Sequence, residues 1–492
     1  MDARVKATSD IKPFMMEANL IGGAWVQADS GETLDVHDPA TGETIGTVPK
    51  SGAAETTRAI EAAFAAWKPF AATTAKHRAD ILRRMADYMM ANQLPLAELL
   101  TLEMGKPLAE AKGEIAIGAQ YLLWFAEEAR RVYGDLIPSP FPGRELMVRK
   151  EAVGVVAAIT PWNFPSSMLA RKIGPAIATG CPSVVKPAEL TPYSGLVWGL
   201  IGKEAGLPDG VINIVTGDAP AIGRAMCEDE RVRKLTFTGS TAVGKLLLQQ
   251  AAGTVKKVSM ELGGNAPFIV FDDADVDAAV EGAIAAKFRN SGQTCVCTNR
   301  FYVQSGIHDA FVEKLAAATD RLNVAPGFED GAQQGPLIDD RALAKVEALL
   351  SDAVEKGATV VTGGGRHERG GTFFQPTVLS GSTAEMRYAT DEIFGPVAPV
   401  FSFDTEEEAI ERANATQYGL ACYFYTRDLG RTYRVMDALE YGLVGVNTGI
   451  MTTPEAPFGG VKASGLGSEG GRQGIEEYLV TKYVSIDGLG RP

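Results

Sequence analysis

The chain has 492 residues, enough material for about three domains. Hydrophobic residues make up 46% of it and charged residues 22%, a balance that excludes a disordered or fibrous chain and allows a large buried core. The 47 Lys and Arg residues against 61 Asp and Glu residues give a formal net charge of −14, which disfavours binding to nucleic acid or to an anionic membrane. The apolar runs are far shorter than the roughly 20 residues that a membrane-spanning helix needs.

The histidines and cysteines exclude several kinds of chemistry. Five cysteines in a chain of this length are too few for a disulfide framework, so the sequence predicts a reducing, cytoplasmic location. The four histidines are widely separated and no Cys-x-x-Cys occurs, so we expect no metal site. Residues 1–19 have neither the apolar stretch of a signal peptide nor the composition of a transit sequence. If the protein is an enzyme, a carboxylate or a thiol must do the proton transfer or the nucleophilic attack.

In chain order, the first predicted elements are helices. Apolar residues recur at helical spacing in Ala53–Trp67, Lys76–Met90 and Pro95–Met104. Residues 132–150 interrupt this pattern with three prolines and short β-prone pieces, as an excursion from the main domain would.

Strand-like and helix-like segments then alternate, which indicates a parallel sheet with helices on both faces. The predicted strands are Val153–Ile159, Ser183–Lys186, Val211–Val215, Lys234–Thr238 and Lys257–Leu262. The predicted helices between them are Ser166–Thr179, Ser194–Ala205, Ala219–Cys227 and Ser240–Ala252. A second alternating series indicates a second α/β domain, with strands at Arg300–Val303, Ala358–Thr362 and Val444–Asn447.

A match to the dinucleotide fingerprint G-x-G-x-x-G occurs at residues 465–470. A genuine fingerprint follows a strand, opens a helix and is followed by an acidic residue within a βαβ unit. The preceding segment 458–462 is loop-like, and only residues 471–492 remain for such a unit. We therefore interpret the match as a glycine-rich turn.

Two other turns are better placed for a nucleotide. Gly239 and Ser240 follow a predicted strand and open a predicted helix, so Ser240 can cap the helix while its first amides face an anion. Lys186 and Glu189 follow another strand, at the sheet edge where ligands bind in open α/β folds, and could contact ribose hydroxyls. The alternative for this second pair is an ion pair at a surface turn.

Three further residues could carry chemistry. Cys295 lies in a short polar loop after the predicted helix Val276–Asn290, where it is either accessible, with amides that lower its pKa, or a small buried residue. Glu261 ends a strand beside two glycines, as an exposed terminus or as a general base in a dry pocket. Asn163 places an amide donor between two prolines at a turn after a strand.

Together these motifs resemble those of the aldehyde dehydrogenase superfamily. The sequences PWNFP, KPAE, FTGST, MELGG, GQTC and EIFGP occur in the order and spacing of that family, and the resemblance covers about residues 18–488. Residues 287–297 and 456–462 resemble the succinate-semialdehyde dehydrogenase branch.

The resemblance implies a mechanism. Cys295 attacks the aldehyde carbon, Asn163 and the Cys295 backbone N–H stabilise the oxyanion, and Glu261 activates the water that hydrolyses the thioester. NAD is the expected cofactor, with NADP possible, because Glu189 would repel a 2′-phosphate. The implied cofactor-binding residues are Trp162, Lys186, Glu189, Gly239, Ser240, Glu392 and Phe394.

The implied substrate is a short aldehyde with a carboxylate at its far end, succinate semialdehyde, with glutarate semialdehyde as the alternative. Arg171 and Arg289 match the arginines that bind this carboxylate in the branch, unless either pairs with a nearby acid. Thr453, in the pair Thr452-Thr453, stands for the serine that the branch uses there. Cys297 is a candidate for a reversible disulfide with Cys295, or a passive small residue.

Other functions of the same fold are a non-catalytic binding protein, a CoA-acylating enzyme and an amino- or betaine-aldehyde dehydrogenase. The complete catalytic set speaks against the first, the presence of Glu261 against the second, and two cations in the aldehyde pocket against the third.

The fold class implied is α/β, with two parallel-sheet α/β domains and a small β oligomerisation element. The coenzyme-binding domain is expected to contain 1–131 and 152–263, the catalytic domain 264–463, and the oligomerisation element 132–151 with 464–492. The predicted strand Tyr478–Ile486 of this element leaves an edge for a second copy, so a homodimer or homotetramer is expected.

Overall fold

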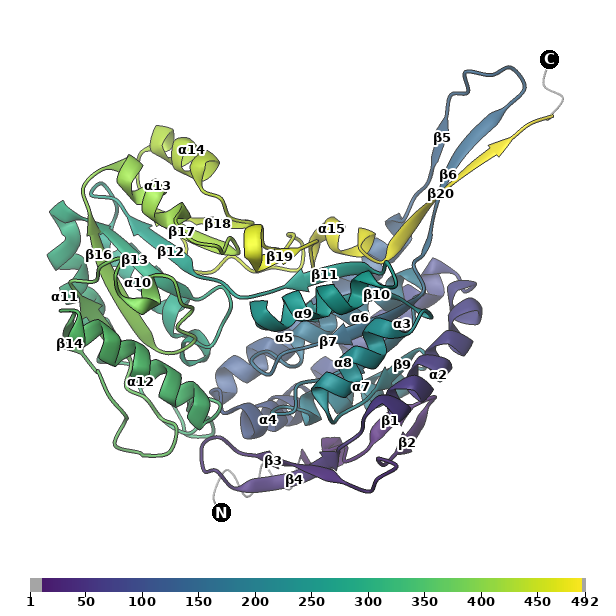
Figure 1. Ribbon diagram of the computed structural model, residues 1–492, viewed down its shortest axis with the longest axis horizontal. Helices are drawn as coiled ribbons and strands as arrows, with labels where there is room; N and C mark the ends of the chain where they lie inside the picture. The colour runs from purple at the N-terminus through teal and green to yellow at the C-terminus, as the bar shows by residue number, and fades with distance from the viewer. Residues whose placement is uncertain (1–10, 489–492) are drawn as a thin grey trace.

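The computed structural model describes residues 11–488 (Figure 1). An eight-stranded sheet organises the first domain, in the order β19-β11-β10-β7-β8-β9-β1-β2. Its five central strands are parallel, as the alternating pattern predicts, and β1 and β19 join it antiparallel. The strands are β1 (Asn19–Ile21), β2 (Ala24–Val26), β7 (Val155–Ile159), β8 (Ser183–Lys186), β9 (Ile212–Ile214), β10 (Val232–Thr238), β11 (Lys257–Glu261) and β19 (Gly465–Leu466).

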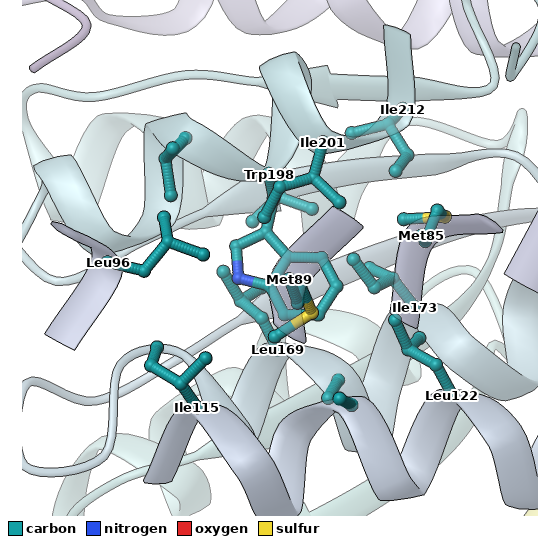
Figure 2. Packing of buried hydrophobic residues seen from close by; sticks show 14 of the residues in the cluster. Met85, Met89, Leu96, Ile115, Leu122, Leu169, Ile173, Trp198, Ile201 and Ile212 are labelled. Atoms are coloured by element: carbon teal, nitrogen blue, oxygen red, sulfur yellow. The ribbon is translucent and has the colours of Figure 1, made fainter. Parts of the chain in front are cut away.

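Helices cover both faces of this sheet. The predicted helices are all present, with ends that differ by a few residues: α2 (Ala53–Ala71), α3 (Ala75–Ala91), α4 (Gln93–Met104), α6 (Ser167–Thr179), α7 (Tyr193–Glu204), α8 (Ala219–Glu228) and α9 (Thr241–Ala252). A further helix, α5 (Leu108–Glu128), which is not among the predicted segments, lies between α4 and α6 in the chain. Figure 2 shows the indole of Trp198 from α7 between apolar side chains of α3, α4, α5 and α6, including Met89, Leu96 and Leu169. Every residue of α6 is buried, so its charged residues Arg171 and Lys172 need partners inside the protein.

The second domain contains a seven-stranded sheet in the order β14-β15-β16-β13-β12-β17-β18, parallel except for the pair β14 and β15. This confirms a second α/β unit. The strands are β12 (Ala266–Val270), β13 (Thr298–Gln304), β14 (Thr359–Thr362), β15 (Thr377–Ser380), β16 (Val397–Phe403), β17 (Ala421–Tyr425) and β18 (Leu443–Val446). The helices are α10 (Val276–Phe288), α11 (His308–Thr319), α12 (Asp340–Glu355), α13 (Glu406–Asn414) and α14 (Leu429–Ala438).

A third, three-stranded sheet forms an arm that projects from the body (Figure 1). It contains β5 (Asp135–Ile137), β6 (Glu145–Ala152) and β20 (Leu479–Ile486), and β20 pairs antiparallel with the whole of β6. Within the chain β20 is an edge strand, and the side chain of Tyr483 on it is exposed.

The expected boundary at residue 464 is wrong. β19 belongs to the first sheet, and the helix α15 (Gly471–Glu476) packs against α5 and α6, so the arm takes only β20 from the C-terminal segment. The cause is strand pairing between segments far apart in the chain, because Met260 and Glu261 in β11 pair with Leu466 and Gly465 in β19.

No βαβ unit contains residues 465–470, but they are not simply a turn, because Gly465 and Leu466 form the strand β19 and only residues 467–470 are irregular. Gly467 and Gly470 have φ values of +79° and +64°, which L side chains rarely adopt. Among residues 11–488 no helix is long and apolar enough to cross a membrane, and no group of three or more His, Cys, Asp or Glu side chains could hold a metal ion.

The short hairpin of β3 (Thr33–His37) and β4 (Thr44–Pro49) stands apart from these three sheets.

Candidate active site

Two cavities meet at Cys295, and residues of both domains line them. The first has a volume of about 290 Å³ and lies against α5, α6 and the loop around Thr452. The second, of about 420 Å³, lies beside the ends of β7 and β10 and the start of α12. Cys295 and Met168 line both, so the sulfur can react with a ligand in one cavity while a second ligand occupies the other.

The loop that carries Cys295 has a strained backbone held by buried contacts. Asn290 and Ser291 have φ values of +53° and +54°, in the left-handed region that costs energy for residues other than glycine. The Asn290 N–H donates to the Glu110 carboxylate (2.9 Å), and the Ser291 hydroxyl donates to the Gly335 carbonyl (2.9 Å). These contacts fix the path of the chain from α10 to the nucleophile.

Gly264, between β11 and β12, lets the backbone come close to this loop. A Cβ at that position would lie 2.4 Å from the carbonyl oxygen of Cys295, so only glycine fits without a backbone shift. The glycines after Glu261 therefore bring the catalytic loop close to the end of β11.

The expectation that loop amides lower the pKa of Cys295 is wrong for this structure. Burial raises the pKa of the thiol to about 12, and the Arg171 guanidinium offsets only part of that effect. The thiol is protonated here at neutral pH, so attack on a carbonyl requires a proton acceptor or a change in its surroundings when ligands bind.

Asn163 is buried, 3% exposed, and lines the second cavity next to Cys295. Its Nδ2 donates to the Gln293 carbonyl (2.9 Å), which uses one of the two N–H groups of the amide and leaves one for an oxyanion. The Asn163 carbonyl accepts from Lys106 Nζ (2.8 Å). Lys106 in turn pairs with Glu114 at 2.6 Å, both side chains being buried. The oxyanion donor is therefore anchored to a buried ion pair.

Glu261 lies at the end of β11 and is 2% exposed. Neither carboxylate oxygen has a hydrogen-bond partner within residues 11–488. Burial, and then the neighbouring Glu469 carboxylate, raise the pKa of Glu261 well above its usual range, while Lys172 and Arg171 oppose this rise. A carboxyl whose pKa approaches the working pH can act as a general base.

The segment at residues 465–470 supplies the acid beside Glu261. Glu469 is buried, and its Oε1 accepts from Lys172 Nζ at 2.5 Å. Lys172 also donates to the Thr236 hydroxyl (3.0 Å). Sequence reasoning missed Lys172 and Glu469, although a lysine in the wholly apolar pattern of α6 is a signal for a buried partner.

Arg171 and Arg289 both line the first cavity with Cys295, but their surroundings differ. The Arg171 guanidinium lies between the rings of Tyr121 and Phe458, with centroids 5.0 and 4.3 Å away, and 4.0 Å from Glu469 Oε2. Arg171 therefore has a nearby acid, Glu469, as the alternative to carboxylate binding predicts, although the two are at the limit of a salt bridge. Arg289 lies 5.6 Å from the ring of Phe164 and has no ion pair among residues 11–488.

Thr453 does not line this cavity. Its side chain is exposed and its hydroxyl donates to the Glu455 carboxylate, whereas Thr452 lines the cavity. Neighbouring residues of an extended loop point in different directions, and the sequence pair Thr452-Thr453 does not reveal which one faces inward.

The second cavity has the features expected for a dinucleotide. Ser240 caps α9 by accepting from the Val243 N–H (3.4 Å), and the buried hydroxyl of Thr238 has no partner within residues 11–488. A Cβ on Gly239 would lie 2.4 Å from the ring of Phe237, so this glycine is required by packing as well as by its place at a possible anion site. These groups at a helix N-terminus fit a phosphate-containing ligand.

Glu392, Phe394 and Trp162 line the other part of this cavity. Glu392 accepts from the Gly264 N–H (3.0 Å), and burial raises the pKa of its carboxyl to about 6. The rings of Phe394 and Trp162 meet edge to face at 5.5 Å, and Phe394 has a φ of +56°. This aromatic pair forms a wall beside Cys295.

Lys186 and Glu189 form an ion pair at the end of β8, with Lys186 buried and the Glu189 side chain 40% exposed. They flank the cavity, which the next residue, Leu190, lines. The ion pair named as the alternative is therefore present, and neither of its residues lines the cavity directly.

Cys297 is buried and lines neither cavity. Its Sγ donates to the Lys287 carbonyl (2.9 Å), while the Lys287 ammonium is buried with no hydrogen-bond partner among the described residues. No disulfide joins any of the five cysteines, all of which lie in the described range.

Comparisons with known proteins show which family this chain resembles. The profile of the aldehyde dehydrogenase family matches residues 25–484. A glutarate-semialdehyde dehydrogenase of Pseudomonas aeruginosa is 57% identical over 98% of this chain and 99% of its own. A succinate-semialdehyde dehydrogenase [NADP(+)] of Escherichia coli is 55% identical over 97% and 99%. The crystal structure of a succinate-semialdehyde dehydrogenase from Burkholderia pseudomallei superposes with a TM-score of 0.96 at 58% identity, over 97% and 99% of the two chains.

Proposed function

Since the chain belongs to the aldehyde dehydrogenase family and is an NAD(P)-dependent enzyme of that type, we propose that it oxidises succinate semialdehyde to the dicarboxylic acid. Glutarate semialdehyde is the second candidate, because a relative that is 57% identical, against 55% for the Escherichia coli relative, is named for it. The observation that carries the proposal is the presence of Arg171 and Arg289 in the same cavity as Cys295. Two guanidinium groups suit the carboxylate of a bifunctional substrate.

In the first step the Cys295 thiol gives its proton to a water molecule in the cavity, and the thiolate sulfur attacks the aldehyde carbon. The carbonyl oxygen becomes an oxyanion, and the free N–H of the Asn163 amide and the Cys295 backbone N–H donate to it. The residues around Ser240 and Glu392 would hold a nicotinamide dinucleotide, which would supply the hydride acceptor needed to oxidise the thiohemiacetal to a thioester.

In the second step Glu261 takes a proton from water, the water oxygen attacks the thioester carbon, and the Cys295 thiolate leaves. Glu469 raises the pKa of Glu261, and Lys172 holds Glu469 in place by donating a hydrogen bond to its Oε1. The base is therefore tuned by a second carboxylate, and neither of the two side chains lines either cavity in this structure.

The test is a comparison of kcat/KM for succinate semialdehyde, glutarate semialdehyde and butanal. A charge-assisted contact to the carboxylate contributes about tenfold or more, so both semialdehydes should exceed butanal by at least that factor. The larger of the two values identifies the substrate. Equal values for all three aldehydes would contradict the proposal.

We also propose a preference for NAD over NADP. Glu189 lies beside the cofactor cavity, and its carboxylate would accept from the ribose hydroxyls but repel a 2′-phosphate. The ion pair supports this preference, because Lys186 already has a partner and is less available to neutralise a phosphate. The relative from Escherichia coli is named for NADP, so membership of the family does not by itself decide between the two cofactors.

Finally, we propose that the arm pairs with a second copy, giving a homodimer or homotetramer in a reducing, cytoplasmic environment. The exposed edge and apolar side chains of β20 support the first point, and five free thiols support the second. Light scattering measures the molar mass of the protein in solution. The mass of a monomer would contradict the proposed homodimer or homotetramer.

A further inference from the structure

The first cavity contains an acidic side chain whose charge the proposed mechanism does not use. Glu110 lies in the first turn of α5 and lines this cavity together with Arg171 and Arg289. A carboxylate is unexpected in a site for a carboxylated ligand, because like charges repel strongly where water is scarce. Its presence requires an explanation.

The other acid of this wall, Glu114, is fully engaged. Its Oε2 accepts from Lys106 at 2.6 Å, and its Oε1 accepts from the backbone N–H groups of Ser166 and Ser167 at 2.9 and 3.1 Å. Glu114 therefore has a cation and a helix N-terminus as partners, and its charge is neutralised locally.

Glu110 differs from Glu114 in this respect. Its Oε2 accepts from the Asn290 N–H (2.9 Å), but no salt bridge joins it to a cation among residues 11–488. The charged group that acts on it most strongly is the buried Lys106, which is already paired with Glu114, and the next cation is Arg289, which itself has no ion pair in that range. The Glu110 carboxyl and the Arg289 guanidinium thus line the same cavity without forming a salt bridge to each other.

We propose that Glu110 is a specificity-determining residue that opposes Arg289 and limits the affinity of the cavity for carboxylated ligands. This inference rests on the proposed function. Its carboxylate repels the far carboxylate of substrate and of product alike, so it weakens their binding without acting on the reacting carbon. Binding that is equally strong for substrate and product does not accelerate the reaction and slows product release. Through Asn290 the same side chain also positions the strained turn that leads to Cys295.

Glu110→Gln and Glu110→Ala separate the two roles. Gln keeps an acceptor for the Asn290 N–H and removes the charge, whereas Ala removes both. In Glu110→Gln the ratio of kcat/KM for the semialdehyde to that for butanal should rise about tenfold, and the inhibition constant of the dicarboxylate product should fall by a similar factor. Glu110→Ala should lower kcat with both aldehydes, because the turn loses its anchor.

A ratio that stays the same or falls in Glu110→Gln would overturn the inference. If the wild-type enzyme shows no preference for the semialdehyde over butanal, the proposed function fails. If the wild-type enzyme shows that preference and Glu110→Gln leaves it unchanged, only the proposed role of Glu110 fails.

A measurement on the wild-type enzyme gives an independent test. Burial raises the pKa of Glu110, with Glu114 acting in the same direction and Lys106 and Arg289 in the opposite one. As pH falls through that pKa the side chain becomes neutral, so KM for the semialdehyde should fall relative to KM for butanal. A KM ratio that does not change with pH would contradict the proposal even if Glu110→Gln failed to fold.

Discussion

The side-chain amide of Asn163 donates a hydrogen bond to the backbone carbonyl of Gln293, 2.9 Å away and two residues before Cys295. The proposed oxyanion donor and the proposed nucleophile, which come from different domains, are thereby tied to one another before any substrate binds. Lys106, paired with Glu114, holds the Asn163 carbonyl from the other side. The oxyanion site is thus pre-organised, which is the condition under which such donors are most effective.

Asn163→Ala should lower kcat for the formation of reduced cofactor by ~10²–10³, the usual effect of removing one oxyanion donor. Cofactor affinity, measured by fluorescence titration, should change far less, because Asn163 donates to the reacting oxygen. A loss confined to cofactor binding would contradict the assignment. The variant also loses the hydrogen bond from Asn163 to Gln293, and a fall in its unfolding temperature measures that separate effect on stability.

Glu261→Gln should abolish turnover but leave a burst of reduced cofactor close to one equivalent per active site, because hydride transfer precedes hydrolysis of the thioester. Rapid mixing with absorbance detection measures the burst. If it is absent, Glu261 is needed earlier, as the proton acceptor for Cys295. Cys295→Ala should lose both phases.

The pH profile of this step depends on Glu469. Since Glu469 raises the pKa of Glu261, deacylation should increase as pH rises through that raised pKa. Glu469→Gln removes the like charge and frees Lys172, and both changes lower the pKa of Glu261. The basic form then persists to lower pH, so the rising limb of kcat should move to lower pH. A shift to higher pH would argue against coupling between the two carboxyls.

Arg289→Ala should raise KM for the semialdehyde by about ten- to a hundredfold with little effect on butanal, since the guanidinium has no ion pair among residues 11–488 to lose. Arg171→Ala should have a similar effect on KM and also lower the unfolding temperature, because Arg171 packs on two rings and lies near Glu469. Arg341→Ala is the matched control, because Arg341 lines only the second cavity. Equal losses on both aldehydes would rule out carboxylate recognition.

Glu189→Ser should move the cofactor preference toward NADP by removing the charge that opposes the 2′-phosphate and releasing Lys186 to contact it. The readout is the ratio of kcat/KM for NAD to that for NADP at saturating semialdehyde. Glu189→Gln keeps the size of the side chain and tests the charge alone. A wild-type enzyme with the higher kcat/KM for NADP would show that this account of the pocket is wrong.

If Cys297 protects Cys295 by a reversible disulfide, activity lost to peroxide should return with dithiothreitol in the wild-type enzyme and not in Cys297→Ala, where Cys295 oxidises further to irreversible acids. The disulfide requires the Cys297 thiol to leave its contact with the Lys287 carbonyl. Cys422→Ala, which removes another buried thiol, is the control. Equal recovery in Cys297→Ala would leave Cys297 as a passive packing residue.

The sequence predicts the helices and strands around the cofactor cavity well, because their apolar periodicity and their capping residues are local features. It does not predict the buried ion pair of Lys106 and Glu114, since charged residues in a helical pattern are ordinarily assigned to the solvent face. The position of Glu114 among the buried residues of α5 is the one local signal. The partnership of Lys172 with Glu469 depends on residues almost three hundred positions apart, which no local pattern contains.

The antiparallel pairing of β19 with β11 has a consequence for the order in which this protein can fold during synthesis. Most strands of the first sheet are complete by residue 261, yet its edge strand and the acid beside Glu261 come from residues 465–470, after the whole second domain. A nascent chain can therefore collapse its first domain early, since domains generally fold from the N-terminus as they emerge. The edge of β11 stays open until the segment at residues 465–470 emerges, and the general base acquires its neighbouring carboxylate only then.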